Sequence, residues 1–130
     1  MKTLASILAG AALAVSGTTA ALAAGPSGEE RLARMLEGRV AGAPESCISD
    51  MHASKDVQVL DRVGLVFKSG NTIWVARARD PESIRDRDVL VVDRRNGQLC
   101  NTDSMRMVDR VTGALQSVVF LDDFVPYRRA

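Results

Sequence analysis

Short runs of strand-forming residues, separated by turn signals at intervals of about 8–12 residues, are the feature that most constrains the fold of this 130-residue chain. The clearest pair of runs covers residues 63–68 and 72–77, with Ser69-Gly70-Asn71 between them. Gly and Asn tolerate the positive φ of a tight turn, so this segment predicts a β-hairpin. A chain built mostly of such units belongs to the mainly β (α+β) class.

Further strands are predicted over the segments 46–49, 57–60, 89–92, 98–100, 105–108 and 115–121. Asn96-Gly97 is the strongest two-residue turn signal, and it predicts that residues 98–100 return alongside residues 89–92. Pro126 is expected to end regular pairing, because proline has no N–H to donate. About seven short strands predict a small antiparallel β-barrel or a tight sandwich, since closing a sheet removes its exposed edges.

One amphipathic helix is predicted ahead of the strands. Leu32, Met35 and Leu36 recur at helical spacing and form a single apolar stripe. Ser27 or Gly28 can cap the start of this helix. A single helical turn is also expected over residues 81–85, where a proline interrupts the strand pattern.

The first 23 residues have the pattern of a cleaved signal peptide. A positive start at Lys2 precedes an apolar run over residues 4–15, and Ala21-Leu22-Ala23 places small residues where a signal peptidase requires them. We expect cleavage after Ala23, a flexible leader over residues 24–28 and a single β-rich domain over residues 29–130. No lipidation cysteine lies near the cleavage site, and no later segment approaches the ~18–20 apolar residues of a membrane span. The predicted location is the periplasm or the exterior.

Cys47 and Cys100 are the two cysteines of the chain. In an oxidising compartment they predict one structural disulfide. A pair of metal-binding or redox thiols is the alternative, but the chain has neither neighbouring ligands nor a C-x-x-C spacing. A disulfide that closes a loop of about 54 residues would stabilise the fold by roughly 4 kcal/mol in the chain-entropy model.

The charge balance argues against a nucleic-acid partner. Lys and Arg number 17 against 16 Asp and Glu, and loss of Lys2 with the signal peptide would make the two equal. A polyanion-binding protein needs an excess of basic side chains. The arginines of residues 77–95 alternate with aspartates, which predicts a solvated face with weak ion pairs. A surface for lipid headgroups or peptidoglycan carboxylates remains the alternative.

Trp74 lies in the best predicted strand, where Thr72 and Ala76 leave room for its ring in a core. An exposed platform for stacking on sugars or peptides is the alternative for Trp74. If the two alternatives for the arginines and for Trp74 are combined, the residues of the possible binding surface are Trp74, Arg77, Arg79, Arg94 and Arg95.

Motifs for catalysis, metal binding or cofactor binding are missing. His52 is the single histidine, and with Asp50 and Asp56 it falls short of a zinc ligand set. Asp122 and Asp123 are predicted to point to opposite faces of an extended strand, so that they cannot share a proton. The chain has no G-x-S-x-G elbow and no glycine-rich phosphate loop. We therefore predict a protein that is not an enzyme and that has no metal and no cofactor.

Four segments of the chain form a recognisable set: Ser46-Cys47-Ile48, Ile73-Trp74-Val75, residues 98–103 (QLCNTD) and residues 123–127 (DFVPY). With these segments the chain resembles a family of small exported proteins from alphaproteobacteria. The resemblance covers about Glu29 to Arg129 and implies export and a disulfide, without a function. Members often carry Asn where this chain has Ala76.

These observations favour a non-catalytic periplasmic or secreted module that binds an envelope component or a protein partner. Two alternatives stay open. One is a small inhibitor of an extracytoplasmic enzyme that presents a loop such as residues 80–88 to its target. The other is a hydrolase with an unrecognised site, which a cleft lined by converging carboxylates with His52 would favour. The sequence leaves the oligomeric state open.

Overall fold

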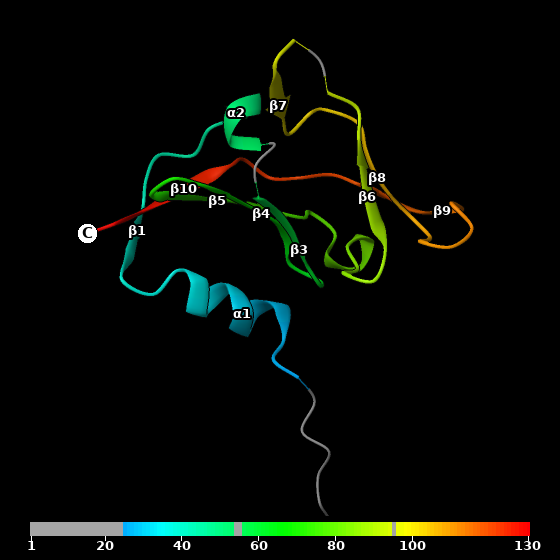
Figure 1. Cartoon of the computed structure of the whole chain (residues 1–130), viewed down its shortest axis with the longest axis horizontal. Helices are drawn as coiled ribbons and strands as arrows, with labels where there is room; N and C mark the ends of the chain where they lie inside the picture. The colour runs from blue at the N-terminus through cyan, green and yellow to red at the C-terminus, as the bar shows by residue number, and fades with distance from the viewer. Residues whose placement is uncertain (1–24, 54–55, 95) are drawn as a thin grey trace, which may run out of the picture.

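The computed structural model describes residues 25–53, 56–94 and 96–130 (Figure 1). The predicted signal peptide, and Arg95 of the possible binding surface, lie outside these residues. The described part is mainly β with antiparallel pairing throughout, as predicted. Its helical elements are α1 (Gly28–Met35), α2 (Asp50–Ala53) and the 3-10 turn η1 (Pro81–Ser83). Its strands are β1 (Arg39–Ala41), β2 (Cys47–Ser49), β3 (Asp56–Leu60), β4 (Gly64–Ser69), β5 (Thr72–Arg77), β6 (Val89–Val92), β7 (Gln98–Cys100), β8 (Met105–Val108), β9 (Leu115–Val119) and β10 (Val125–Arg129).

A five-stranded sheet in the order β1-β10-β5-β4-β3 is the centre of the molecule. The predicted hairpin forms β4 and β5, and Gly70 in its turn has a φ of 57°. Both strands are apolar on both faces. Phe67 pairs with Trp74 on one face, and Val66 pairs with Val75 on the other. The sheet is therefore covered on both sides.

Helix α1 covers one face of this sheet (Figure 1). Its N-cap is Ser27, whose Oγ accepts a hydrogen bond from the Glu30 backbone N–H at 3.2 Å. Leu32 is buried at 2% exposure, and Met35 and Leu36 pack beside it against the apolar side chains of this face. The predicted stripe is confirmed as the contact between helix and sheet.

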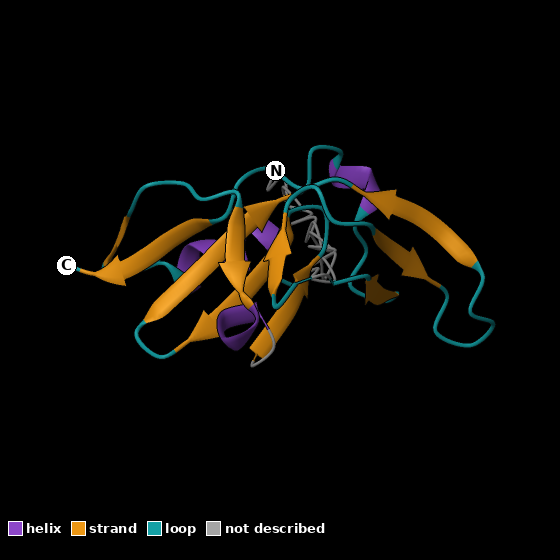
Figure 2. Ribbon diagram, turned by 90° about the horizontal axis from the view of Figure 1, so that it is seen from above, coloured by secondary structure: helices purple, strands orange, loops and turns teal. Residues whose placement is uncertain are grey.

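The opposite face holds the larger core, beneath α2 and two smaller sheets. One of these sheets is the pair β2-β7, and the other has the order β6-β8-β9. Figure 2 shows the β8–β9 hairpin extending away from the five-stranded sheet. Met105 and Met107 of β8 are fully buried, and both point from the three-stranded sheet into this core.

The predicted disulfide is confirmed. Cys47 and Cys100 are direct register partners in β2 and β7, and the bond joins positions 53 residues apart in the chain. It therefore ties the first half of the chain to the second across two short strands.

One predicted strand pairing, that of residues 89–92 with residues 98–100, is wrong. Asn96 and Gly97 do form a turn with positive φ, but β7 pairs with β2, and β6 pairs with β8. The disulfide holds β7 on β2. The alternating burial of β8 places its two methionines beside Leu90 and Val92 of β6.

Pro126 does not end the pairing, because it lies inside β10 between β1 and β5. Its carbonyl accepts a hydrogen bond from the Gly42 N–H at 2.7 Å, just past the last residue of β1. In an antiparallel sheet the N and C=O of one residue point toward the same neighbouring strand. The nitrogen of Pro126 therefore faces the β1 side, beyond the end of the β1 ladder, where a proline is tolerated.

The sheets stay open in the described part of the chain, so the predicted barrel is not formed there. The five-stranded sheet ends at β1 on one side and β3 on the other. The described residues also form β1 and β10, two strands that the sequence did not predict. Among the described residues, no helix has the length and apolar character needed to cross a membrane.

Candidate functional site

A hollow of about 470 Å³ lies on the face of the five-stranded sheet that α1 covers, since Val75 and Tyr127 in its lining belong to the apolar cluster packed against that helix. It brings together Arg77 and Arg79, two residues of the predicted binding surface. We call it the arginine hollow. Its lining residues are Pro44, Val75, Arg77, Arg79, Asn101, Asp122, Asp123, Val125 and Tyr127.

The floor of the arginine hollow is apolar because two central strands turn the same face toward it. Val75 of β5 is the register partner of Val125 of β10. Tyr127 follows two residues later on β10, and residues two apart in a strand share a face. The floor therefore comes from rigid, hydrogen-bonded strands.

Arg77 at the end of β5 is bound to Glu29 in the first turn of α1. Its Nη1 and Nη2 donate to the two carboxylate oxygens of Glu29 at 2.6 and 3.3 Å. This hydrogen bonding holds the pKa of Glu29 below its usual value and raises the pKa of Arg77, although partial burial of each group acts the other way. The pair links the helix to the sheet at the edge of the hollow.

Arg79 lies two residues beyond Arg77, and its Nε is 3.5 Å from Oδ1 of Asp122. Both side chains are about 60% exposed. Backbone pairing brings them together, because the Arg79 N–H donates to the Phe120 carbonyl and the Asp122 N–H donates to the Arg77 carbonyl. Nε makes the close approach in this ion pair, and in the described part of the chain the terminal nitrogens of Arg79 have no hydrogen bond.

Asp123 completes the acidic side of the arginine hollow. Its Oδ1 accepts a hydrogen bond from Nδ2 of Asn101 at 2.8 Å. The predicted regular strand is absent at Asp122 and Asp123, since Leu121 and Phe124 make only isolated bridges on either side of them. Both aspartates therefore line the same hollow. The two carboxylates have separate partners.

Trp74 and Arg94, the other described residues of the predicted surface, lie elsewhere. Trp74 is 4% exposed, so the interpretation as a core residue is confirmed, and its ring lies 5.8 Å from that of His52. Arg94 donates to the Ala53 carbonyl at 3.0 Å and lines a separate groove on the opposite face of the sheet, with Val59 and Leu90. Of the four described members of the predicted set, Arg77 and Arg79 lie together, whereas Trp74 and Arg94 lie apart from them.

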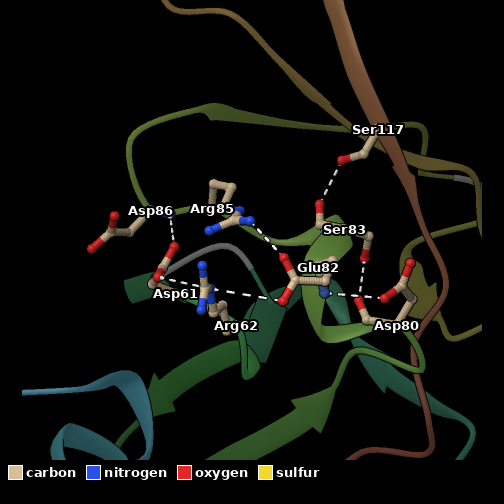
Figure 3. A network of polar contacts seen from close by, with 8 residues as sticks. All are labelled: Asp61, Arg62, Asp80, Glu82, Ser83, Arg85, Asp86 and Ser117. Atoms are coloured by element: carbon tan, nitrogen blue, oxygen red, sulfur yellow. Dashed lines mark hydrogen bonds and ion pairs between the residues drawn. The ribbon is translucent and has the colours of Figure 1, made fainter.

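Residues 80–88 are anchored at their base, as Figure 3 shows. Asp80 accepts a hydrogen bond from the Glu82 N–H at 3.1 Å, and the Ser83 carbonyl accepts one from the Ser117 hydroxyl. Glu82 pairs with Arg85 at 2.6 Å. Ile84 is completely buried, whereas residues 86–87 are exposed.

The contact between His52 and Ser69 was not predicted from the sequence. Nδ1 of His52 lies 2.8 Å from the Ser69 hydroxyl oxygen, across the start of the β4–β5 turn. No sequence signal could have found this pair, because the two residues are 17 positions apart and belong to no motif. His52 does not line the arginine hollow. Among the described residues, no group of three or more His, Cys, Asp or Glu side chains is placed to hold a metal ion.

The three-stranded sheet exposes apolar side chains on the face turned away from the core. We call this the outer apolar face. Its most exposed members are Val89 at 40%, Leu115 at 60%, Val118 at 48% and Phe120 at 60%. Arg106 of β8 is paired with Asp93 at 3.1 Å.

Comparisons with protein-family models, with curated protein sequences and with solved structures give no match for this chain. The resemblance to small exported alphaproteobacterial proteins therefore stays a prediction.

Proposed function

We propose that this chain is a non-catalytic binding module, exported to the periplasm or the exterior, which binds a component of the cell envelope in the arginine hollow. The observation that carries the proposal is the meeting of Arg77 and Arg79 over an apolar floor. Guanidinium groups beside apolar surface suit a ligand that carries carboxylates, because Arg can bind a carboxylate through two parallel hydrogen bonds.

Export is supported by the sequence of residues 1–23 and by the Cys47–Cys100 disulfide, since such bonds persist in oxidising compartments. A non-catalytic role is supported by the polar groups of the hollow. The carboxylates of Asp122 and Asp123 are bound to Arg79 and Asn101 respectively, and the one histidine lies elsewhere.

The test is an affinity pull-down from an envelope extract with the mature, disulfide-bonded protein as bait. Arg79→Ala should lose the retained component, because it removes one of the two guanidiniums of the hollow. Arg110→Ala is the matched control, since Arg110 is exposed in the β8–β9 hairpin, and it should retain the component. Equal retention by wild type and both variants would refute the proposal.

A small enzyme inhibitor is the second candidate. The observation in its favour is that residues 80–88 combine a buried base at Ser83 and Ile84 with an exposed tip at residues 86–87. A preorganised loop binds a target with little loss of conformational entropy. If this function holds, Arg87→Ala should abolish inhibition of an extracytoplasmic hydrolase while Arg79→Ala leaves it unchanged.

A further inference from the structure

The arginine hollow carries charges of both signs around its apolar floor. Arg77 and Arg79 provide two positive charges, and Asp122 and Asp123 provide two negative charges. A purely anionic or purely cationic ligand would meet as much repulsion as attraction at such a site. The ligand that matches the hollow is one that itself carries both charges.

The positive side of the hollow has unused hydrogen-bond donors at Arg79. A guanidinium offers five N–H donors. Asp122 lies 3.5 Å from Nε of Arg79, whereas Glu29 contacts both terminal nitrogens of Arg77. The terminal nitrogens of Arg79 are therefore the better position for a ligand carboxylate, because a bidentate contact there leaves the Glu29–Arg77 pair intact.

The negative side has unused acceptors at Asp123. A carboxylate offers about four lone-pair sites. Asp123 accepts from Asn101 through Oδ1, and this bond leaves Oδ2 for another donor. The Asn101 hydrogen bond also fixes the position of the carboxylate, so that an ammonium group can bind without first ordering the side chain.

The floor and the size of the hollow limit the rest of the ligand. A volume of about 470 Å³ falls within the range of roughly 300–1,000 Å³ typical of small-molecule sites. Val75, Val125 and Tyr127 offer an apolar surface between the two charged sides. An apolar side chain of the ligand would cover this surface and remove it from water.

We propose that the arginine hollow binds an amino-acid-derived zwitterion, with its carboxylate at Arg79, its ammonium group at Asp123 and an apolar side chain on the floor. This inference rests on the proposed function and names the ligand class of the same site. Free amino acids and short peptides with free ends share this chemistry. The test below distinguishes these two sources.

The test is isothermal titration calorimetry of the mature, disulfide-bonded protein with free leucine, with the dipeptide leucyl-alanine, and with this dipeptide N-acetylated or C-amidated. We expect leucine, the free dipeptide or both to bind, and each cap to weaken dipeptide binding at least about tenfold, because each removes one charge contact. Comparison of leucine with the dipeptide identifies the source. Inorganic phosphate, which carries only negative charge, should bind more weakly than either.

Two variants assign the ends of the ligand. In Arg79→Gln the free and C-amidated dipeptides should bind equally, because the carboxylate has lost its partner. In Asp123→Asn the free and N-acetylated dipeptides should bind equally. Arg110→Gln should match the wild type, and circular dichroism should verify that all three variants are folded.

Equal binding of free and capped peptides, or no binding of leucine and the free dipeptide, would overturn the zwitterion assignment. If the envelope pull-down still depends on Arg79 in that case, the ligand class is wrong and the proposed function stands. If the pull-down is also unaffected by Arg79→Ala, both fail.

Discussion

Single residues set how closely neighbouring strands approach and how the helix is joined to the sheet. Gly64 begins β4 opposite Arg77, and an added Cβ would overlap the backbone carbonyl of Ala76. Glu29 connects α1 to the end of β5 through its pair with Arg77. One contact is steric and the other electrostatic, so substitutions of Gly64 and Glu29 are expected to affect stability differently.

Gly64→Ala should lower the free energy of unfolding by about 2 kcal/mol or more, because the new methyl group meets backbone that cannot rotate away. Urea denaturation of the purified protein measures the change. Gly25→Ala is the control, since an added Cβ at Gly25 has no neighbour within 4 Å. Equal stability of Gly64→Ala and wild type would show that the two strands can separate to accept a side chain.

Glu29→Gln should cost less than about 1 kcal/mol at pH 7, because both partners of the pair are at least half exposed. Its pH dependence is the sharper test. Arg77 lowers the pKa of Glu29, so the contribution to stability is present above the ordinary value of 4.5 and is lost as the pH falls through the lowered pKa.

The stability difference between wild type and Glu29→Gln should therefore shrink as the solution is acidified from pH 7. Thermal unfolding between pH 7 and pH 3 measures this difference. Glu37→Gln, at an exposed position beyond α1, serves as the control. A difference that grows toward low pH would contradict the assigned role of the pair.

At the scale of elements, the β6-β8-β9 sheet has one face in the core and one in contact with solvent. Met107 of β8 is fully buried, whereas Phe120 just beyond β9 is 60% exposed. The hairpin between β8 and β9 is closed by Asp109, which accepts hydrogen bonds from the N–H groups of Val111 and Thr112 at 2.9 and 2.8 Å. These bonds, with that from the Thr112 hydroxyl, hold the pKa of Asp109 below its usual value.

Substitutions on the two faces of this sheet should differ in their effect. Met107→Ala should cost about 2–5 kcal/mol, because it leaves a cavity in the main core. Phe120→Ser should change stability by no more than about 0.5 kcal/mol, because the ring is already largely in water. Denaturant unfolding of both variants measures the contrast, and a loss at Phe120 comparable to that at Met107 would contradict it.

Asp109→Ala should loosen the β8–β9 turn without unfolding the protein. The amide protons of Val111 and Thr112 should exchange faster with solvent, because each loses its acceptor. Hydrogen-exchange NMR resolves the two residues, and the amide of Leu99 in the buried strand β7 serves as the internal control. Unchanged exchange at both turn residues would show that the backbone alone holds the turn.

At the scale of the whole molecule, one covalent bond joins the two halves of the chain. β2 and β7 form a sheet of only three register pairs, and the disulfide lies at one of them. Ile48 and Leu99 form the next pair and are both buried in the main core. The bond therefore holds a small sheet against a core that the larger sheets build.

Removing both sulfur atoms with the double substitution Cys47→Ala and Cys100→Ala should lower the free energy of unfolding by up to about 4 kcal/mol, because the unfolded chain regains the freedom of a long closed loop. Thermal and urea denaturation measure the loss. Wild type treated with a reductant should lose a similar amount. An unchanged midpoint in both samples would show that the small sheet needs no covalent support.

The sequence alone determined the features that depend on neighbouring residues. The β4–β5 hairpin followed from its turn residues, α1 from its apolar stripe and the burial of Trp74 from its small neighbours. The Cys47–Cys100 pairing followed from a count of two. Export and the alphaproteobacterial resemblance stay predictions, because they depend on residues or relatives that the structure does not contain.

Only the tertiary structure decided which distant segments meet. Asn96-Gly97 specifies a turn but not the partner of the strand that follows it, because strand pairing depends on packing across the core. Pro126 is accommodated within β10 because β1 ends beside it, which is a property of another segment. The arginine hollow likewise joins Arg77, Asn101 and Asp123 from three parts of the chain, so that no local pattern of residues could describe it.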